Sequence, residues 1–447
     1  MRLPMRVRRC GSTRSSLAFA ATTGKGHVVA LPRAVRSAVG VLVPGIDALD
    51  LPVVGLDALD GRAGSHHAVL DPLARDHPVV RIEGIGYLVL ARAAVDAALR
   101  ARDTSMPALA LLELQGVTEG PVHRYLAGNL LSLSGKEHRA QRRRVSGALG
   151  PARAERLRPT MRGHLEELLD AVTTPEVEFV SAVAKPYPAR MIAEIVGAPV
   201  SDAGRLGDWA YWIQAALDPL QLAVHLDQIE TAAAGFDVYV REELFTIDPS
   251  EATGLLADLL PEVAAGDLDG GDAASLISSV LVGGVDTTQA QLAHAVRLLA
   301  ENPEQWELLV EDPALLPAAV AEVLRFEPIT PFTARLAMAE LDLDGMTVPE
   351  GTLLIACTAT ANRDPETYAR PEVFDITADR GDAAHLTFGA GAHFCIGHAL
   401  ARAELEEALA MLVERYARLE LAAPPVFDSP SGVYGLLELP LRLHPHR

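Results

Sequence analysis

One cysteine of the segment 388–402, FGAGAHFCIGHALAR, has surroundings suited to binding a metal through its sulfur. Glycine and alanine precede His393, so the backbone can fold tightly and direct main-chain N–H groups at the sulfur of Cys395. The apolar spacing that follows predicts a helix opening at Cys395, whose positive end favours the thiolate over the thiol. The segment therefore predicts a metal-bound thiolate. The alternative is a buried structural cysteine, because free cysteine is among the most buried residue types.

An acid and an alcohol interrupt a long apolar segment at residues 272–301, whose periodicity predicts one helix. Gly283 and Gly284 each cost a helix interior about 1 kcal/mol relative to alanine. Such a pair leaves room for a flat ligand and eases local opening of the helix, so that Asp286 and Thr287 can turn toward a bound group. The arrangement suits proton transfer. The alternative is that these polar side chains only cap or break the helix.

A carboxylate and a guanidinium lie three residues apart in the apolar helical segment 313–326. The spacing puts Glu322 and Arg325 on one face of the helix. An exposed pair of this kind contributes only about 0.2–0.5 kcal/mol, so a surface salt bridge is one interpretation. The apolar neighbours Leu324 and Phe326 favour the other, a buried structural pair.

The segment 388–402 resembles the cysteine-ligand loop of the cytochrome P450 monooxygenases at every position of the pattern FGxGxHxCxGxxLAR. The resemblance implies haem b with its iron held by Cys395, in a loop that includes Phe388 and Gly389. Thiolate ligation of this kind pushes electron density toward the iron and favours O–O cleavage. Residues 283–288, GGVDTT, are similar to the acid–alcohol motif of the family, which implies proton delivery by Asp286 and Thr287.

The same resemblance implies roles for further residues. Glu322 and Arg325 match the Glu-x-x-Arg pattern of the family, and Arg380 is the candidate for the arginine that completes it, since Val373 stands where one variant of the family has arginine. Binding of the haem propionates is implied for His138, Arg142, Arg335 and His393, although a solvated helix face is the alternative for His138. The substrate pocket is implied over Ser279, Val282, Gly283, Ile329, Phe332 and Thr333, with lids at 103–130 and 209–228.

The resemblance implies a bacterial-type monooxygenase that activates O₂ with two NAD(P)H-derived electrons from a ferredoxin and ferredoxin reductase, and oxidises a lipophilic small molecule. The ferredoxin is expected to dock by electrostatic steering near Arg139, Arg143 and Arg144. One rival is a haem-thiolate peroxygenase or isomerase relative, which usually lacks the acid–alcohol pair. A second rival is a non-enzymatic haem gas sensor, which usually carries another module.

Charge is distributed unevenly along the 447 residues, whose formal net charge is −20. Residues 1–46 hold eight Lys and Arg and no acid, which leaves −28 for the rest of the chain. We expect 1–46 to be a basic, disordered or mis-started leader, because no well-formed apolar stretch follows Arg8 and Arg9. The acidic remainder argues against nucleic-acid binding. Neither a run of 18 apolar residues, as a transmembrane anchor requires, nor a disulfide framework occurs, so we expect a cytoplasmic protein.

Residues 47–447 are expected to form one domain, mainly α with small β-sheets. In this cytochrome P450-type fold, haem would lie between the long central helix and the cysteine-loop helix. Strands are expected within 79–91, joined at 84–86, and within 341–357 around a turn at Gly345. Helical periodicity predicts helices at 138–149, 152–172, 187–197, 203–217, 226–246, 254–265, 272–301, 303–309, 313–326 and 397–418.

Overall fold

The computed structural model describes residue 46 and residues 49–55, 66–381, 383–428 and 432–446, together with the short strands β1 (Ala21–Thr22) and β2 (Val28–Val29). The expected leader at 1–46 therefore lies almost entirely outside the described residues. Its last residue, Ile46, is 1% exposed and packs into the core of the large sheet.

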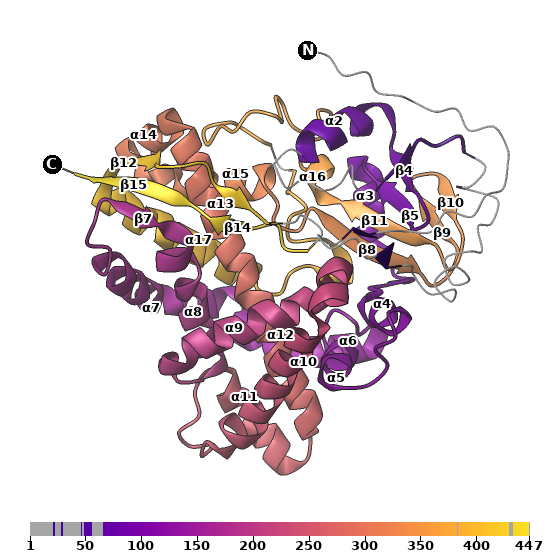
Figure 1. Cartoon of the computed structure of the whole chain (residues 1–447), viewed down its shortest axis with the longest axis horizontal. Coiled ribbons are helices and arrows are strands. Elements are labelled where there is room, and N and C mark those ends of the chain that lie inside the picture. Colours follow the sequence, from indigo (N-terminus) through magenta and orange to yellow (C-terminus); the bar gives the residue numbers. More distant parts are fainter. Residues whose placement is uncertain are drawn as a thin grey trace.

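Helices make up most of the described chain, as the sequence predicts (Figure 1). They are α2 (His66–Asp76), α3 (Arg92–Arg100), α4 (Ala108–Leu114), α5 (Pro121–Gly128), α6 (Gly135–Leu149), α7 (Pro151–Asp170), α8 (Pro186–Val196), α9 (Ala203–Gln214), α10 (Pro219–Glu242), α11 (Gly254–Ala265), α12 (Gly270–Gly284), α13 (Asp286–Glu301), α14 (Pro303–Glu311), α15 (Leu316–Phe326), α16 (Thr358–Ala361) and α17 (His398–Arg415). A π-helical turn, η3 (Val180–Ala184), precedes α8. Among the described residues, no helix combines the length and apolar character required to cross a membrane.

The largest sheet has six strands in the order β3-β4-β5-β11-β8-β6 and lies at the upper right of Figure 1. Its strands are β3 (Val53–Val54), β4 (Val79–Ile82), β5 (Gly86–Val89), β6 (Thr104–Ser105), β8 (Phe332–Ala337) and β11 (Leu353–Cys357). Side chains alternate between its faces, so that Val79 and Tyr87 pack on the side of α3 while Val80 and Leu88 pack on the side of α2. Both faces are therefore buried.

The remaining strands form small two- and three-stranded sheets. Strands β9 (Leu341–Leu343) and β10 (Met346–Val348) form the predicted hairpin at Gly345, whose φ of 81° requires the left-handed region. The C-terminal strands β12 (Tyr416–Leu421) and β15 (Pro440–Pro445) pair with β7 (Glu176–Glu178), while β13 (Val426–Phe427) pairs with β14 (Leu436–Glu438). The sheet formed by β12 and β15 packs against α13, α14 and α17 through β12.

The predicted central helix is two helices, because the backbone breaks at Val285 between α12 and α13. Val285 has φ −87° and ψ −73°, and Thr287 Oγ1 donates a hydrogen bond to the Gly283 carbonyl 2.6 Å away. A threonine hydroxyl that bonds the carbonyl four residues earlier bends a helix. Gly284, the last residue of α12, packs directly against the end of the Ile192 side chain of α8. The break thus coincides with the acid–alcohol segment.

Candidate haem-thiolate site

The loop that carries Cys395 connects the sheet region to α17 and depends on glycine backbone geometry. Gly389 and Gly391 have φ values of 69° and 71°, and the Cys395 amide donates to the Phe388 carbonyl at 2.8 Å, which closes the loop. A Cβ on Gly391 would lie 2.8 Å from the Leu99 carbonyl oxygen of α3. The backbone of this loop therefore packs against α3 more closely than any side chain would allow.

The sulfur of Cys395 is enclosed by the protein and is approached by main-chain donors. Burial raises the pKa of the Cys395 thiol, while hydrogen bonds from the Gly397 and His398 amides and the charge of Arg142 act in the opposite direction. The helix opens at His398, three residues after the start expected at Cys395 and one residue after the start of the helix predicted at 397–418. The amides at the start of α17 still reach the sulfur. A coordinating metal cation would deprotonate this thiol outright.

Four basic side chains gather beside the cysteine loop. The rings of His138 and His393 lie 4.3 Å apart between centroids. Burial lowers the pKa of His393 to about 4, and the nearby His138, Arg335 and Arg142 lower it further. Arg335, 4% exposed, has its pKa lowered to about 10 by burial. Its hydrogen bond runs to the Ala334 carbonyl, and within the described part of the chain neither Arg335 nor Arg142 forms an ion pair with a carboxylate.

Buried cations need anionic partners, because the transfer of a charge out of water is costly unless the charge is paired. The basic set of His138, Arg142, Arg335 and His393 lies next to Cys395 and has no carboxylate of its own among the described residues. The buried Arg335 and the half-buried Arg142 therefore fit a ligand that carries acidic groups, such as the two propionates of haem b, and the rings of His138 and His393 can donate hydrogen bonds to the same groups. His138 is 3% exposed, so the solvated-face alternative for this residue does not hold.

The acid and the alcohol of the central segment have different surroundings. Asp286 is 9% exposed, and burial raises its pKa to about 7, with Lys185 lowering it and Asp428 raising it. Thr287 is half-buried one turn from Gly283. A Cβ on Gly283 would meet nothing within 4 Å, so this face of α12 borders open space. The segment combines a carboxyl group that titrates near neutrality with a hydroxyl and with room for a ligand.

Glu322, Arg325 and Arg380 form one buried network. Arg325 donates from Nε and Nη2 to the two carboxylate oxygens of Glu322, both at 2.8 Å, and Arg380 Nη2 donates to Glu322 Oε1 at 2.6 Å. The side chains of Glu322 and Arg325 are only 3% and 2% exposed. Arg325 also donates to the Asn362 and Pro371 carbonyls, and Arg380 to that of Val373. The surface salt-bridge interpretation is therefore excluded.

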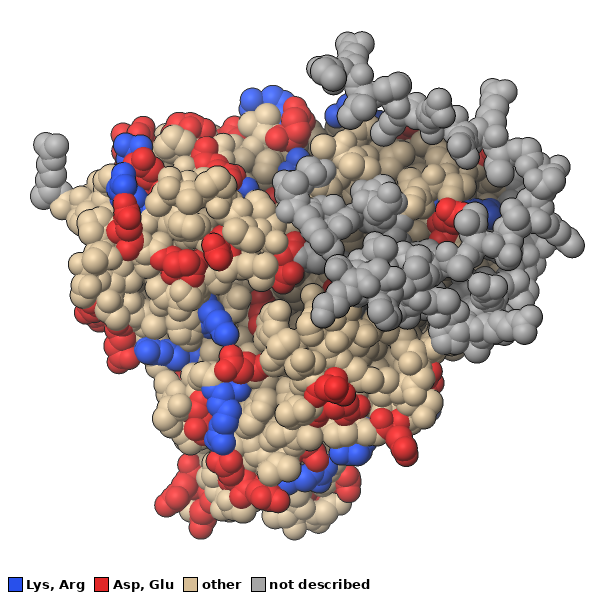
Figure 2. Space-filling view, in the orientation of Figure 1, with Lys and Arg blue, Asp and Glu red and all other residues tan. Residues whose placement is uncertain are grey.

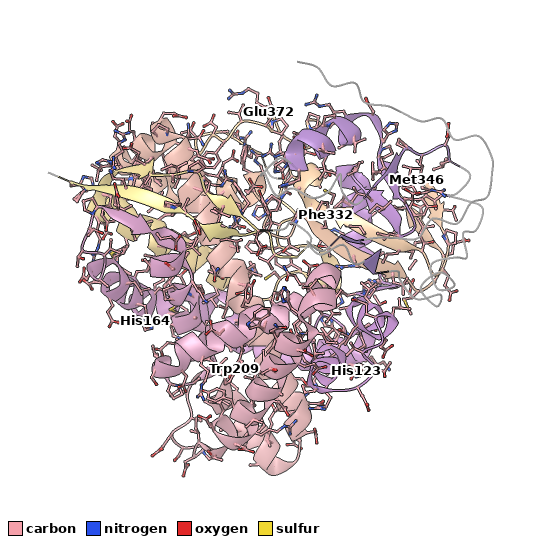
Figure 3. The ribbon with its side chains drawn as sticks, viewed as in Figure 1. His123, His164, Trp209, Phe332, Met346 and Glu372 are labelled. Carbon is pink, nitrogen blue, oxygen red and sulfur yellow. The ribbon has the colours of Figure 1, made fainter. Side chains whose placement is uncertain are left out.

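The residues expected to line a substrate pocket do not share one environment. Gly283, Phe332 and Thr333 are at least partly exposed, and Phe332 at the start of β8 lies where the sheet meets the helices (Figure 3). Val282 is 2% exposed within the helical core, so it does not border the space beside Gly283. Ile329 is buried, with 7% of its surface exposed. The Ser279 hydroxyl donates a hydrogen bond to the Ser275 carbonyl and accepts one from the Leu130 amide, so its hydrogen bonds are made within the protein.

The expected lids at 103–130 and 209–228 contain β6, α4 and α5 in the first and the end of α9 with the start of α10 in the second. Trp209 packs against Phe236 and Tyr239 inside the helical part (Figure 3). Its ring therefore supports the lid and does not line a pocket. The second lid also contains the backbone irregularity at His225, with φ −121° and ψ 23° within α10.

Sequence reasoning missed a second buried polar cluster, centred on Glu327 directly after α15. Its members, all of them buried, are His66, His67, Gln291, His294, Arg297 and Glu327. The sequence signals were two adjacent histidines at the start of a helix and an acid directly after the Glu322 motif. Neither signal has a spacing that marks a site by itself, because the members come from three helices far apart in the chain.

Comparisons with known proteins match this fold and site. The family model for Cytochrome P450 matches residues 227–443. Luteothin monooxygenase of Streptomyces thioluteus is 33% identical over 374 residues, which are 83% of this chain and 91% of that protein. Pentalenic acid synthase of Streptomyces avermitilis is 33% identical over 318 residues, 70% of this chain and 77% of that protein.

Solved structures of cytochrome P450 enzymes have the same fold as this chain. CalO2 superposes with a TM-score of 0.79 at 27% identity, covering 87% of this chain and 97% of CalO2. CxnD, a P450 enzyme for C–S bond formation in chuangxinmycin biosynthesis, also gives a TM-score of 0.79, at 28% identity over 89% of this chain and 99% of CxnD. The chain therefore belongs to the cytochrome P450 family.

Membership in this family defines the activity. The protein is a haem-thiolate monooxygenase that uses haem b and O₂. It takes electrons from NAD(P)H through a ferredoxin and its reductase, and it inserts one oxygen atom into a lipophilic small molecule.

Replacement of Glu322 by alanine should greatly reduce the yield of haem-loaded protein. The change leaves Arg325 and Arg380 without their buried carboxylate, and breaking a buried pair costs about 3–5 kcal/mol. The measurement is the haem content per chain together with the free energy of unfolding. Glu155→Ala is the matched control, because Glu155 and Arg158 have the same spacing on α7 but are exposed. Full haem content in Glu322→Ala would contradict the structural role.

Proposed function

We propose that Cys395 is the axial thiolate ligand of the haem and that His138, Arg142, Arg335 and His393 hold its propionates. The observation that carries this proposal is a basic set, half-buried at Arg142 and His393 and buried at His138 and Arg335, that has no carboxylate partner among the described residues and lies next to a sulfur that receives two main-chain hydrogen bonds. Phe388 and Gly389 shape the loop, since the Phe388 carbonyl accepts from Cys395 and Gly389 has a positive φ.

When bound, the haem supplies the electron-transfer and O–O cleavage chemistry that a thiolate ligand favours. The amides of Gly397 and His398 keep the sulfur in place and moderate its charge. Glu322, Arg325 and Arg380 act as structural residues that hold the segment before the cysteine loop. None of these three side chains is proposed to contact the substrate.

Asp286 and Thr287 are proposed to deliver protons into the open space beside Gly283. Below about pH 7 the buried Asp286 carboxyl is protonated, and above it the group ionises, so it can both accept and release a proton under physiological conditions. The Thr287 hydroxyl then releases its hydrogen bond to the Gly283 carbonyl, donates its proton into the open space and takes another proton from Asp286. Retention of this pair favours the monooxygenase over the peroxygenase, isomerase and gas-sensor alternatives, which need no such relay.

The substrate is proposed to be a lipophilic secondary metabolite that enters beside Gly283, Phe332 and Thr333, with Ser279 at the pocket edge and Val282 and Ile329 supporting it from the packed interior. The named relatives support this class, since they include an erythromycin C-12 hydroxylase and a pentalenic acid synthase. The lids at 103–130 and 209–228 would close over such a ligand.

The ferredoxin is proposed to dock at Arg139 and Arg143, which are exposed on α6. Arg144 was expected to contribute, but its Nε donates to Glu262 Oε2 of α11 at 2.8 Å, so its charge is already paired. Acidic side chains are spread widely over the face of the protein shown in Figure 2. A basic surface at Arg139 and Arg143 would therefore attract an acidic ferredoxin more strongly than such acidic regions do. The proposal thus assigns docking to two of the three arginines.

We also propose a single P450 domain over residues 47–447, with 1–46 as a separate basic leader, and a cytoplasmic location. The location is supported by the described cysteines, Cys357 and Cys395, which are both free. Cys357 is fully buried in β11, in agreement with the core position that its apolar neighbours predict.

The central test is the replacement of Cys395 by serine. The reduced carbon monoxide complex of the wild-type protein should show the red-shifted absorption band of thiolate ligation, and the variant should lack it. Cys357→Ser is the control, because Cys357 lies in the sheet core. A variant at 395 that keeps the band would overturn the ligand assignment.

Thr287→Ala should leave haem and substrate binding nearly intact while less product forms per NADPH consumed and more peroxide is released. The hydroxyl acts after binding, so its loss affects the coupling of electrons to product. The measurement is product and peroxide per NADPH with a verified substrate and a competent donor pair.

Asp286→Asn provides the comparison for this variant. It removes the group that titrates near pH 7, so turnover should slow and lose any inflection near that pH. If Thr287→Ala forms as much product per NADPH as the wild type, the assignment to Thr287 is wrong and the proton is delivered by Thr288 or by water.

The docking proposal predicts that the Arg139→Ala/Arg143→Ala variant accepts electrons from ferredoxin several-fold more slowly at low ionic strength. The difference should vanish near 1 M salt, where screening acts over about 3 Å. Stopped-flow reduction measures this rate, and Arg241→Ala on α10 is the control because Arg241 is also exposed and basic. An unchanged rate at low salt would place the docking surface elsewhere.

A further inference from the structure

The polar cluster around Glu327 contains a set of side chains that the monooxygenase reaction does not use. His66 opens α2, His67 follows it, and Glu327 follows α15 directly. One ligand atom from each of the three lies within 4.8 Å of the others. Helices α2 and α15 lie near each other in the upper part of Figure 1, although their residues are about 260 positions apart in the chain.

His66 is the member whose environment is least satisfied. Its side chain is 0% exposed, and neither Nδ1 nor Nε2 has a hydrogen-bond partner among the described residues. Its Nε2 lies 3.8 Å from Glu327 Oε1, which is too long for a hydrogen bond. Buried polar groups nearly always have a partner, so this imidazole requires an explanation.

The distances suit a small cation between the three groups. His67 Nε2 lies 3.2 Å from Glu327 Oε1, and the rings of His66 and His67 are 4.1 Å apart between centroids. A tetrahedral Zn²⁺ with ligands at about 2.0–2.2 Å holds neighbouring ligand atoms about 3.3 Å apart. The two separations from Glu327 Oε1, 3.2 and 3.8 Å, lie close to this value, and all three ligand atoms lie within 4.8 Å of one another, so the site needs the histidine rings to move slightly inward around the ion.

A carboxylate also faces the second ring nitrogen of His67, although at a distance that is too long for a hydrogen bond. This nitrogen, Nδ1, faces Asp71 Oδ1 at 3.8 Å, one turn further along α2. A histidine that binds a metal through one nitrogen usually donates its other N–H to a carboxylate, which fixes the ring. Asp71 Oδ1 is buried and has no hydrogen-bond partner within the described part of the chain.

The nearby cations do not prevent the binding of a metal, because carboxylates already neutralise them. Arg297 contacts Glu301 at 2.6 Å and Glu327 Oε2 at 2.9 Å, so Oε1 of Glu327 faces the histidines and, among the described residues, is hydrogen-bonded only to His67 Nε2. Arg363 lies 3.7 Å from Asp71 Oδ2. Three carboxylates therefore face two guanidinium groups around the cluster, a net charge of −1 before any metal binds.

We propose that His66, His67 and Glu327 form a binding site for a divalent transition-metal ion, with Zn²⁺ as the ion that two imidazoles and one carboxylate favour. Asp71 orients His67. The metal ties α2 to the end of α15, and its role is structural, because none of its three ligands belongs to the haem or substrate site. The site differs from the haem site in every ligand.

The test uses haem-loaded, tag-free protein that has been treated with a chelator and then equilibrated with Zn²⁺, so that Cys395 is already occupied. Wild-type protein should bind one Zn²⁺ per chain in competition with a chromogenic chelator, and its Tm should rise with Zn²⁺ concentration. His66→Phe keeps the ring and removes both nitrogens, so affinity should fall at least about 100-fold, and Asp71→Asn should lower it about 10- to 100-fold.

His123→Phe is the matched control, because His123 also contacts a glutamate but lies near the surface in α5 (Figure 3). It should bind Zn²⁺ as the wild type does. Without metal, the Tm of His66→Phe should be no lower than that of the wild type, because the His66 ring forms no hydrogen bond with the described residues that the substitution could remove. Absence of stoichiometric binding, or equal binding by His66→Phe, would overturn the proposal.

X-ray absorption at the zinc edge of the wild-type holoenzyme gives a readout that needs no variant. Nitrogen and oxygen neighbours with histidine scattering are expected. Sulfur neighbours would place the ion at a cysteine and would also overturn the proposal.

Discussion

The buried carboxylate of Glu322 is the interaction on which the haem site depends. It receives hydrogen bonds from Arg325 and Arg380, and these two arginines donate in turn to carbonyl groups of the segment 362–373. Asn362 connects this segment to the cysteine loop. Its side chain accepts a hydrogen bond from the Leu386 amide and donates one to the Thr387 hydroxyl, directly before the loop. One carboxylate thereby fixes the end of α15 relative to the loop that presents the sulfur.

The buried polar and charged groups are of two kinds: those that are fully paired within the protein and those that lack a partner among the described residues. In the Glu322 network every charge is paired and the surrounding carbonyls accept the remaining N–H groups, as a structural site requires. Beside Cys395, Arg335 is buried without a carboxylate, and near Glu327 the ring of His66 is buried without a partner, in each case among the described residues. Unpaired burial of this kind is costly, so it identifies positions where a ligand completes the structure.

Local patterns were sufficient for the elements and motifs that depend on neighbouring residues. The periodicity at 254–265 matches α11 at both ends, and Gly345 marks the turn between β9 and β10. Strand β8 and the C-terminal strands were not predicted, because their partners lie far away in the chain and pairing decides strand formation there. The glycine pair predicted local opening of the central helix, but not its division into two separate helices at Val285.

The sequence by itself determined the family and the order of the motifs, because these follow from spacing within short segments. Tertiary structure decided which charges are paired. Arg144 is paired with Glu262, Val282 lies in the core, and His66 and His67 lie beside Glu327. The physical reason is that burial and ion pairing depend on distances between helices, and a linear sequence does not contain those distances.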